Sequence, residues 1–305
     1  MDKFIMPVVL GVILGTYARF HLLRVDFRQY PSYPQGYTVH LFLGFVAASM
    51  GAVAIPALVA KHYEAVTFLA LALQQFREVR RVERETLEEL EATELVPRGS
   101  AYVEGIAKVF EARNYLAVLT ALVASGLALF LPFGALVRGG IGGLGGLVTI
   151  FLLEKSMEGD VVGNLAKIRP APLEFRGPQL FVGDTFVMNV GLPHSREIIL
   201  KHGLGAIIEP VDPNARATLS NIGQRQAIVH DLATILGVRK DLDEPEFTPI
   251  ARLNHENGHI GVVIVPMARD EEALRMAIRR VPVIESAKRR PMDAIAGKEA
   301  YKRIK

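Results

Sequence analysis

Apolar residues gather in four long runs in the first half of the chain, and charged residues are nearly absent from 38–60 and 115–153. A helix needs about 20 consecutive apolar residues to cross the hydrocarbon core of a bilayer. The pattern therefore predicts a polytopic α-helical membrane domain over 1–153 with four spans. The runs cover 4–18, extending to 23 if Arg19 reaches the interface, then 38–60, 115–133 and 139–153.

A fifth apolar stretch, 65–73, is shorter than a span and runs into polar residues. We interpret it as the start of a packed or interfacial helix, which leaves the choice between four and five spans open. The charged segment that follows predicts a solvated helix over 75–95, with a coiled-coil partner site as the alternative. A second predicted helix, 101–114, leads straight into the third span. We expect 61–113 to form a helical cytoplasmic loop.

The basic residues predict the orientation, because cytoplasmic loops of membrane proteins carry an excess of Lys and Arg. With the first residues inside, twelve basic residues near the spans are cytoplasmic and four are external. One local comparison disagrees, since Arg19, Arg24 and Arg28 outnumber Lys3 across the first span. We predict a multi-pass protein of the cell membrane with both termini cytoplasmic. The internal set is Lys3, Lys61, Arg77, Arg80, Arg81, Arg84, Arg98, Lys108, Arg113, Lys155, Lys167 and Arg169, and the external set is Arg19, Arg24, Arg28 and Arg138.

The fourth run opens with glycines four residues apart, Gly139 with Gly143 and Gly142 with Gly146. Small residues at this spacing give a smooth helix face that another helix can approach closely. Two interpretations follow: packing inside one bundle, or homo-oligomerisation through this face. No Asp, Glu or Lys lies deep in any run, which disfavours a pump or a coupled transporter.

From residue 154 the composition is that of an ordinary cytoplasmic domain. Gly and Pro punctuate 154–177, which we interpret as a linker. Over 178–286 the elements alternate as β-α-β-α-β-β-α-β, which predicts a cytoplasmic α/β domain with a ferredoxin-like fold as one candidate. Residues 287–305 form a basic tail, expected to be solvated, with contact to an anionic membrane surface as the alternative. Predicted strands lie at 185–190, 206–209, 248–253, 260–265 and 281–284, and predicted helices at 195–202, 220–236 and 271–280.

One pattern in this half suggests metal chemistry, because His255-Glu256-Asn257-Gly258-His259 matches the H-E-x-x-H signature of zinc proteases. That signature binds zinc only on a helix, where residues i and i+4 share a face. Asn257-Gly258 instead favours a two-residue hairpin, which would turn the two imidazoles to opposite faces. The sequence has no cysteine, P-loop or G-x-S-x-G nucleophile elbow, so we predict no cofactor, no metal and no enzymatic activity. A net charge of +3 argues against nucleic acid as a partner.

Residues 95–115 read LVPRGSAYVEGIAKVFEARNY and contain the hexapeptide Tyr102-Val103-Glu104-Gly105-Ile106-Ala107. LVPRGS also matches a thrombin-cleavable linker, but both flanks continue one pattern, so we treat it as natural sequence. The hexapeptide resembles the signature of the YIEGIA family of membrane proteins from endospore-forming bacteria, with Val103 in place of Ile. The resemblance extends to RVDFRQYP at 24–31 and EPEFTP at 244–249. It implies a sporulation-linked assembly with a small capping-type protein subunit as partner, and it supplies no catalytic residues.

We therefore predict a non-enzymatic integral membrane protein that acts as a scaffold or regulator of a membrane-associated assembly, in sporulation or spore envelope formation. A passive pore or transporter subunit is the alternative, and a membrane-bound hydrolase that uses His255 and His259 is the third hypothesis. The lipid bilayer is a partner in each case, and a homo-oligomer is compatible with all three.

Overall fold

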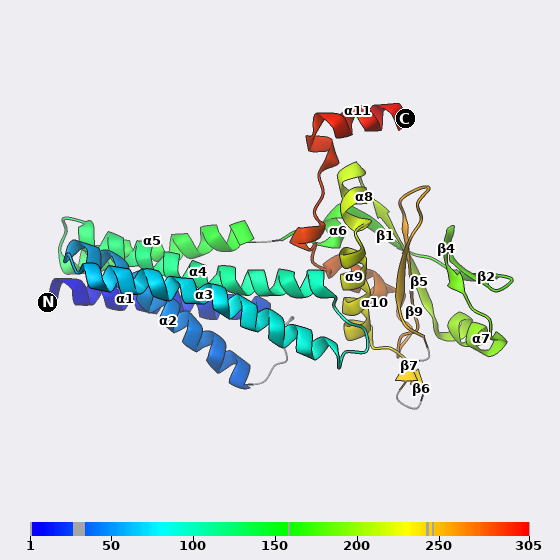
Figure 1. The fold of residues 1–305 in the computed structure, drawn as a ribbon, viewed down its shortest axis with the longest axis horizontal. Helices are drawn as coiled ribbons and strands as arrows, with labels where there is room; N and C mark the ends of the chain where they lie inside the picture. The colour runs from blue at the N-terminus through cyan, green and yellow to red at the C-terminus, as the bar shows by residue number, and fades with distance from the viewer. Residues whose placement is uncertain (1, 27–33, 158, 242–243, 246, 305) are drawn as a thin grey trace. The chain divides into compact units, whose positions relative to one another are not determined.

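The computed structural model describes residues 2–26, 34–157, 159–241, 244–245 and 247–304 (Figure 1). The chain divides into two compact units. The helical unit contains Met1–Glu85 and Ile106–Glu158, and the C-terminal unit contains Thr86–Gly105 and Gly159–Lys305. The C-terminal unit is therefore built from two separate pieces of the chain, one of which lies between the second and third predicted spans.

Five long helices supply the helical unit, and four of them are long and apolar enough to cross a membrane. The protein is thus a membrane protein by the length and composition of its helices. The fourth helix runs without interruption from the hexapeptide into the third span, as predicted. The helices are α1 (Asp2–Asp26), α2 (Pro34–Val59), α3 (Tyr63–Glu91), α4 (Ser100–Phe130) and α5 (Ala135–Met157).

Glycine contacts fix the relative directions of these helices. A methyl group on Gly15 would lie 2.7 Å from both the Ala48 Cβ of α2 and the Ala117 carbonyl oxygen of α4. One turn earlier along α1, Gly11 faces residues 52 and 121, which lie one turn later in α2 and α4 than the partners of Gly15. Both α2 and α4 are therefore antiparallel to α1, and they run parallel to each other.

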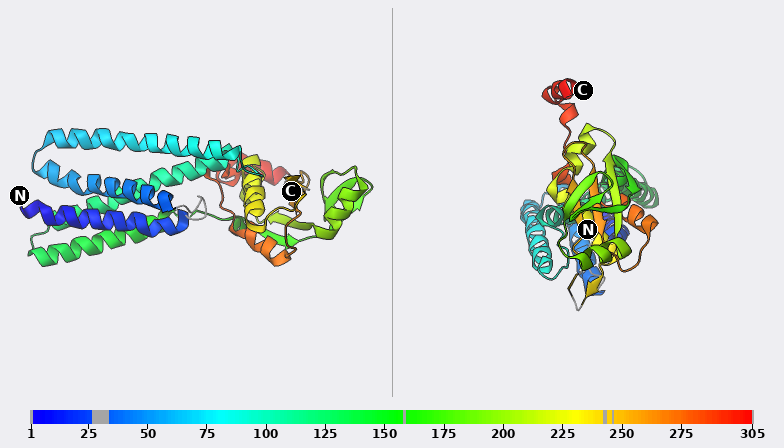
Figure 2. Two further views of the ribbon diagram at one scale, coloured as in Figure 1. Left: turned by 90° about the horizontal axis from the view of Figure 1, so that it is seen from below. Right: turned by 90° about the vertical axis from the view of Figure 1, so that its right-hand side faces the viewer.

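This parallel arrangement contradicts the expectation that 61–113 forms a loop on one side of the bundle. Helix α3 returns along the bundle between α2 and α4, because Leu69, Ala72 and Val79 pack against the buried α2–α4 cluster. Figures 1 and 2 show the start of α1, the α2–α3 turn and the α4–α5 turn at one end of this unit. The stretch 65–73 forms the first part of α3. Its short length and polar flank are the reason why the sequence did not predict a span there.

A four-stranded antiparallel sheet in the order β1-β5-β9-β8 forms the centre of the C-terminal unit. Strands β5 and β8 run parallel to each other with β9 antiparallel between them, which is a split β-α-β arrangement. A smaller sheet, β2-β3-β4, packs on one face, and α9 and α10 pack on the other. The strands are β1 (Ala166–Pro170), β2 (Leu173–Arg176), β3 (Gln179–Val182), β4 (Thr185–Asn189), β5 (Leu204–Pro210), β6 (Lys240–Asp241), β7 (Glu244–Pro245), β8 (Ile250–Leu253) and β9 (Ile260–Ile264). The helices are α6 (Val162–Leu165), α7 (Pro193–His202), α8 (Pro213–Leu219), α9 (Ile222–Leu236), α10 (Glu271–Arg280) and α11 (Ile295–Ile304), with short 3-10 turns η1 (Glu285–Ala287) and η2 (Pro291–Asp293).

The two central strands explain the layers, because β5 and β9 are apolar on both faces and successive side chains point to opposite sides. Ile207 and Val263 pack toward the small sheet, in one cluster with Leu180 and Val182. Gly261 lets the two sheets approach closely, since a methyl group there would lie 2.9 Å from the Thr185 Cγ2.

The structure corrects two predictions for this half. The expected linker 154–177 contains β1 and β2, and β1 pairs with β5 from Ala166↔Pro210 to Pro170↔Ala206. Pro170 and Pro172, which suggested a linker, instead separate two short strands. The strand predicted at 281–284 forms only an isolated bridge between Pro282 and Val161, because β1 already occupies that edge of the sheet. The basic tail contains η2 and α11 and is mostly exposed, which agrees with the expectation of a solvated tail.

Candidate functional site

Residues 95–105, which we call the motif segment, pack onto helix α9 within the C-terminal unit. His230 donates a hydrogen bond from Nδ1 to the Val96 carbonyl oxygen at 2.7 Å, and the imidazole is almost completely buried. One turn earlier on α9, the Gln226 side-chain amide donates to the Pro97 carbonyl oxygen. Buried backbone carbonyls need such partners. Helix α9 therefore satisfies the turn that precedes α4.

The aromatic ring of the motif lies beside the same helix. The Tyr102 hydroxyl is 3.4 Å from Asp231 Oδ2, and its ring meets the His230 ring edge-to-face with centroids 6.2 Å apart. Asp231 and His230 are neighbours on α9, so one short stretch of this helix contacts Val96, Pro97 and Tyr102 together.

A second set of bonds fixes the turn that presents the motif segment. Glu91 accepts hydrogen bonds from the backbone N–H groups of Arg98 and Gly99 at 3.0 and 2.7 Å. The Arg98 guanidinium lies 3.3 Å from Glu91 and 3.1 Å from Glu94. Gly99 has φ +84°, a left-handed conformation that glycine adopts without strain. The LVPRGS stretch thus has specific partners in the fold, as expected of natural sequence.

Burial shapes the electrostatics of Asp231 and His230. Burial raises the pKa of Asp231 to about 6, although the Tyr102 hydroxyl and Arg98 act in the opposite direction. Burial also lowers the pKa of His230, although the hydrogen bond to Val96 opposes this change. At neutral pH the site therefore holds a neutral imidazole beside an ionised carboxylate, and burial of this charge is unfavourable to the stability of the folded state.

We expect Asp231→Asn to stabilise the C-terminal unit at pH 7.5. A raised carboxyl pKa means that the folded state binds the proton more tightly, so this group's contribution to stability is largest below pH 3.8 and is lost as pH rises to about 6. Asparagine still accepts the Tyr102 hydroxyl hydrogen bond and carries no charge. The gain is on the order of 2–3 kcal/mol, or about 5 °C in the unfolding midpoint.

The measurement is thermal unfolding of the purified full-length protein at pH 7.5 and at pH 4.5, with the exposed Asp293→Asn as the matched control. The advantage of Asp231→Asn should shrink at the lower pH. A variant less stable than wild type at pH 7.5 would contradict the electrostatic account.

Three apolar residues of the hexapeptide and its glycine contribute to packing. Val103, Ile106 and Ala107 are buried, Glu104 is half-buried, and a methyl group on Gly105 would meet the Ile284 Cγ2 at 3.6 Å. Within this hexapeptide, Tyr102 contributes a side-chain hydrogen bond to Asp231 of α9.

Comparison with known proteins identifies the family of this chain, because the model of the YIEGIA protein family matches residues 7–294. The chain belongs to the YIEGIA family. The uncharacterized protein YphB of Bacillus subtilis (strain 168) is 42% identical over 299 residues, covering 98% of this chain and 99% of its own. No solved structure matches the chain. The hexapeptide that suggested YIEGIA membership therefore contributes Tyr102 to the contact with α9. Residues 27–31 of RVDFRQYP and Glu246 of EPEFTP lie outside the described residues.

The glycines of α5 in this YIEGIA chain divide into two faces. Gly142 and Gly146 pack against α4 and α1, with a methyl group on Gly142 lying 2.8 Å from the Ala124 carbonyl oxygen. Gly143 has no atom within 4 Å, and Gly139 has only the Met6 side chain nearby, at 3.7 Å. The structure therefore brings one glycine pair into the bundle and leaves the other on its surface.

The H-E-x-x-H sequence lies in the connection between β8 and β9. Leu253 pairs with Ile260, so six residues form the turn rather than the expected two. The Asn254 N–H donates to the His259 carbonyl oxygen at 2.8 Å. His255 and His259 therefore lack the one-turn helical spacing that the zinc signature requires. Within the described ranges, no group of three His, Asp or Glu residues could hold a metal ion.

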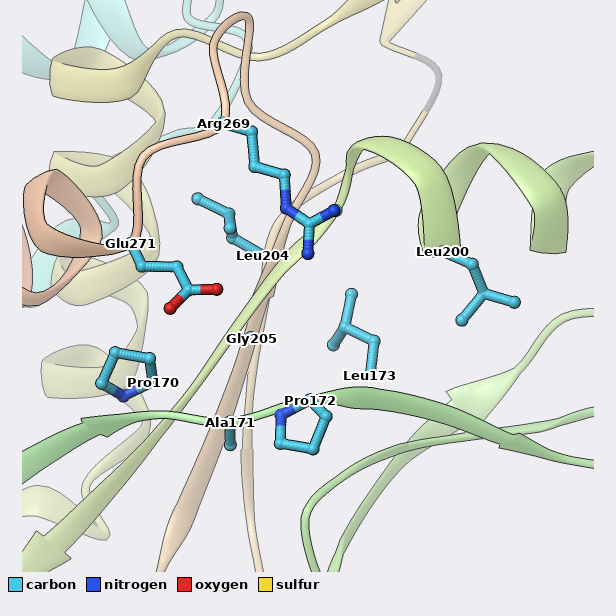
Figure 3. A pocket seen from close by; sticks show the side chains of 10 residues that line it. Pro170, Ala171, Pro172, Leu173, Leu200, Leu204, Gly205, Arg269 and Glu271 are labelled. Atoms are coloured by element: carbon cyan, nitrogen blue, oxygen red, sulfur yellow. The ribbon is translucent and has the colours of Figure 1, made fainter.

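A separate hollow of about 340 Å³ opens between the end of β1 and the start of α10. Figure 3 shows the Arg269 and Glu271 side chains pointing toward its centre. Arg269 and Glu271 are the charged residues of this lining, which contains no nucleophile. The lining residues are Pro170, Ala171, Pro172, Leu173, Leu200, Gly203, Leu204, Gly205, Arg269 and Glu271.

Sequence reasoning missed the α9 side of the site. His230-Asp231 and Gln226 match no catalytic or metal-binding motif in the sequence. A usable signal existed, because His230 interrupts an apolar stripe that holds Val229 and Leu232. A polar group on a buried face requires a hydrogen-bond partner.

Proposed function

We propose that this YIEGIA protein is a non-enzymatic integral membrane protein that acts as a scaffold or regulator of a membrane-associated assembly in sporulation. The proposal is supported mainly by the way the C-terminal unit is assembled from two separate segments of the chain. The chain connects this unit to the helical unit three times, at residues 85–86, 105–106 and 158–159. A domain with three covalent connections to membrane helices has far less freedom than one on a single linker. Such a domain suits a fixed docking platform.

We also propose that α3 crosses the membrane, which gives five crossings. Two features support this: α2 and α4 run in the same direction, and α3 packs along both. Residues 86–105 and 159–304 must lie on one side because they form one unit, and the two crossings α4 and α5 between them satisfy this requirement.

The basic residues give the orientation of these five crossings. One end of the bundle carries Lys3, Lys61 and Arg138, and the other carries Arg80, Arg81, Arg84, Lys108, Arg113 and Lys155. We therefore place the C-terminal unit in the cytoplasm and Lys3 outside. This proposal differs from the expectation that both termini are cytoplasmic, and in the proposed orientation the basic cluster at Arg19, Arg24 and Arg28 no longer disagrees.

The partner that we propose is the small capping-type subunit implied by the family resemblance, bound at the C-terminal unit. We expect mild-detergent capture of the tagged wild-type protein from sporulating cells to retain a stoichiometric small protein that vegetative cells do not supply. Tyr102→Ala, which removes the ring that packs on Asp231 and His230, should lose this partner, because the motif segment then separates from α9. Mass spectrometry of the captured material is the measurement.

Tyr63→Ala is the matched control, because Tyr63 is 67% exposed at the start of α3. Immunoblots of the membrane fraction verify that all three proteins accumulate equally. Capture of no partner in either growth state would contradict the assembly role, and flux through proteoliposomes would then test the pore or transporter alternative.

A further inference from the structure

The hollow between the end of β1 and the start of α10 is separate from the contact between the motif segment and α9. Its volume is about 340 Å³, and all of its lining residues belong to the C-terminal unit. Pockets for small molecules typically enclose roughly 300–1,000 Å³. A hollow at the lower end of this range suits a ligand with few non-hydrogen atoms.

Two glycines shape one wall of the hollow. Gly203 and Gly205 lie against Leu173, because a methyl group on either glycine would lie 2.7 Å from a Leu173 Cδ atom. The Ala171 N–H donates to the Gly205 carbonyl oxygen at 2.9 Å, which attaches the chain between β1 and β2 to β5. The backbone around these glycines therefore holds Leu173 at the wall.

Two opposite charges point into this space. Arg269 precedes α10 by two residues and Glu271 is the first residue of α10, and Figure 3 shows both side chains directed toward the centre of the hollow. Within the described part of the chain, neither side chain forms an ion pair. Arg269 donates one long hydrogen bond, of 3.4 Å, to the Lys201 carbonyl oxygen. Both charges are thus available to a ligand.

The signs of the charges select the kind of ligand. An anion attracted by Arg269 would be repelled by the nearby Glu271, and a cation attracted by Glu271 would be repelled by Arg269. A zwitterion satisfies both side chains at once. Its carboxylate can accept two parallel N–H bonds from the guanidinium, and its ammonium group can donate to the glutamate carboxylate. A free α-amino acid carries these two groups on adjacent carbon atoms.

Leucine side chains lie beside the two charges. Leu204 is buried, whereas Leu200 at the end of α7 is 47% exposed. Figure 3 shows Leu173, Leu200 and Leu204 around the same space. An apolar ligand side chain packed against Leu200 would remove part of its exposed surface from water, which favours binding.

We propose that this hollow binds a free α-amino acid with an apolar side chain. Arg269 holds the α-carboxylate, Glu271 holds the α-ammonium group, and the leucines contact the side chain. The inference goes beyond the proposed assembly role and does not depend on it, because its test uses the purified protein without any partner.

The test measures the unfolding midpoint of the purified full-length protein with L-leucine as the probe. Isocaproate, which lacks the ammonium group, and isoamylamine, which lacks the carboxylate, are the reference compounds. At a hundredfold excess over its Kd, L-leucine should raise the midpoint by about 5 °C. Each reference compound should bind at least about tenfold more weakly, because it loses one charged interaction and keeps one repulsion. At the same concentration its shift should be half as large or smaller.

Two variants locate the site through a change in ligand preference. Glu271→Gln removes the repulsion of anions, so isocaproate should become as effective as L-leucine. Arg269→Gln should do the same for isoamylamine. A purely structural effect would not exchange the preferred compound in this way. Both residues are exposed, so the variants should fold normally. Arg280→Gln, at the exposed opposite end of α10, is the matched control and should keep the wild-type response.

Three results would overturn the proposal. The first is the absence of a shift with L-leucine at about 20 mM, a concentration that detects even weak binding. The second is an equal shift of the wild-type protein with isocaproate or isoamylamine. The third is an unchanged order of the three compounds in both Glu271→Gln and Arg269→Gln.

Discussion

A cysteine at Gly134 should react with an impermeant maleimide added to intact cells, and a cysteine at Ser156 should react only after the membrane is permeabilised. Gly134 lies in the α4–α5 turn with no atom within 4 Å of an added side chain, and Ser156 is exposed near the end of α5. The two positions lie at opposite ends of one helix, so the orientation of the bundle fixes their difference. The native chain has no cysteine, so each variant carries a single thiol.

The α2–α3 turn distinguishes five crossings from four. His62→Cys should react from outside if α3 crosses the membrane, whereas a cytoplasmic loop over 61–113 would protect it. Residue 32 lies outside the described residues, but in the proposed orientation α1 ends and α2 begins at the cytoplasmic end of the bundle. Ser32→Cys should therefore be protected, the reverse of what four spans require. A reactive Ser32→Cys with a protected His62→Cys would restore the four-span topology.

Gly15→Leu should prevent the helical unit from forming its native bundle. The Cβ alone would lie 2.7 Å from the Ala117 carbonyl oxygen and from the Ala48 Cβ, and the rest of the leucine has no space. A backbone oxygen cannot move aside as a side chain can, so α1 must separate from α2 and α4. We expect a loss of about 3 kcal/mol or more, measured as a lower unfolding midpoint and a smaller yield of monodisperse protein.

Gly143→Leu is the matched control, since this glycine on α5 has no atom within 4 Å. A leucine on a lipid-facing surface should change stability by less than about 0.5 kcal/mol. A comparable loss in Gly143→Leu, or a change in oligomer mass by light scattering, would indicate that this face packs against a second copy. That result would favour the homo-oligomer interpretation of the glycine spacing over bundle packing alone.

Local patterns predicted much of the C-terminal unit. The hairpin strands were expected at 248–253 and 260–265 and lie at Ile250–Leu253 and Ile260–Ile264, and α10 begins and ends where its apolar stripe indicated. The order of the strands in the sheet was not predictable in this way. Whether β1 or 281–284 occupies the edge beside β5 depends on packing between distant residues, and proline between short strands gives the same local signal as a linker.

The sequence predicted which segments of the helical unit form apolar helices, but it did not predict the direction in which each helix runs. Each apolar run indicated a span, but only contacts between helices reveal that α2 and α4 are parallel. Charged residues on the second half of α3 lower its mean hydropathy. The hydropathy pattern therefore indicated a loop where the helix returns along the bundle. Arg19 was misplaced for a related reason: an arginine near the end of a span usually reaches the interface, but Arg19 has no exposed surface and lies beside Gly44 of α2 and Phe110 of α4.

The sequence separation between the motif segment and α9 sets an order of events during synthesis. Tyr102 and Asp231 are 129 residues apart. At elongation rates of about 5–20 residues per second, the motif segment waits roughly 6–26 s for its partner helix to be made. Helices α4 and α5 are completed within this interval, so membrane insertion of both precedes closure of the C-terminal unit. Until then, in the proposed orientation, the Val96 and Pro97 carbonyl groups lack their α9 partners on the cytoplasmic side, where a chaperone or an early assembly partner can reach them.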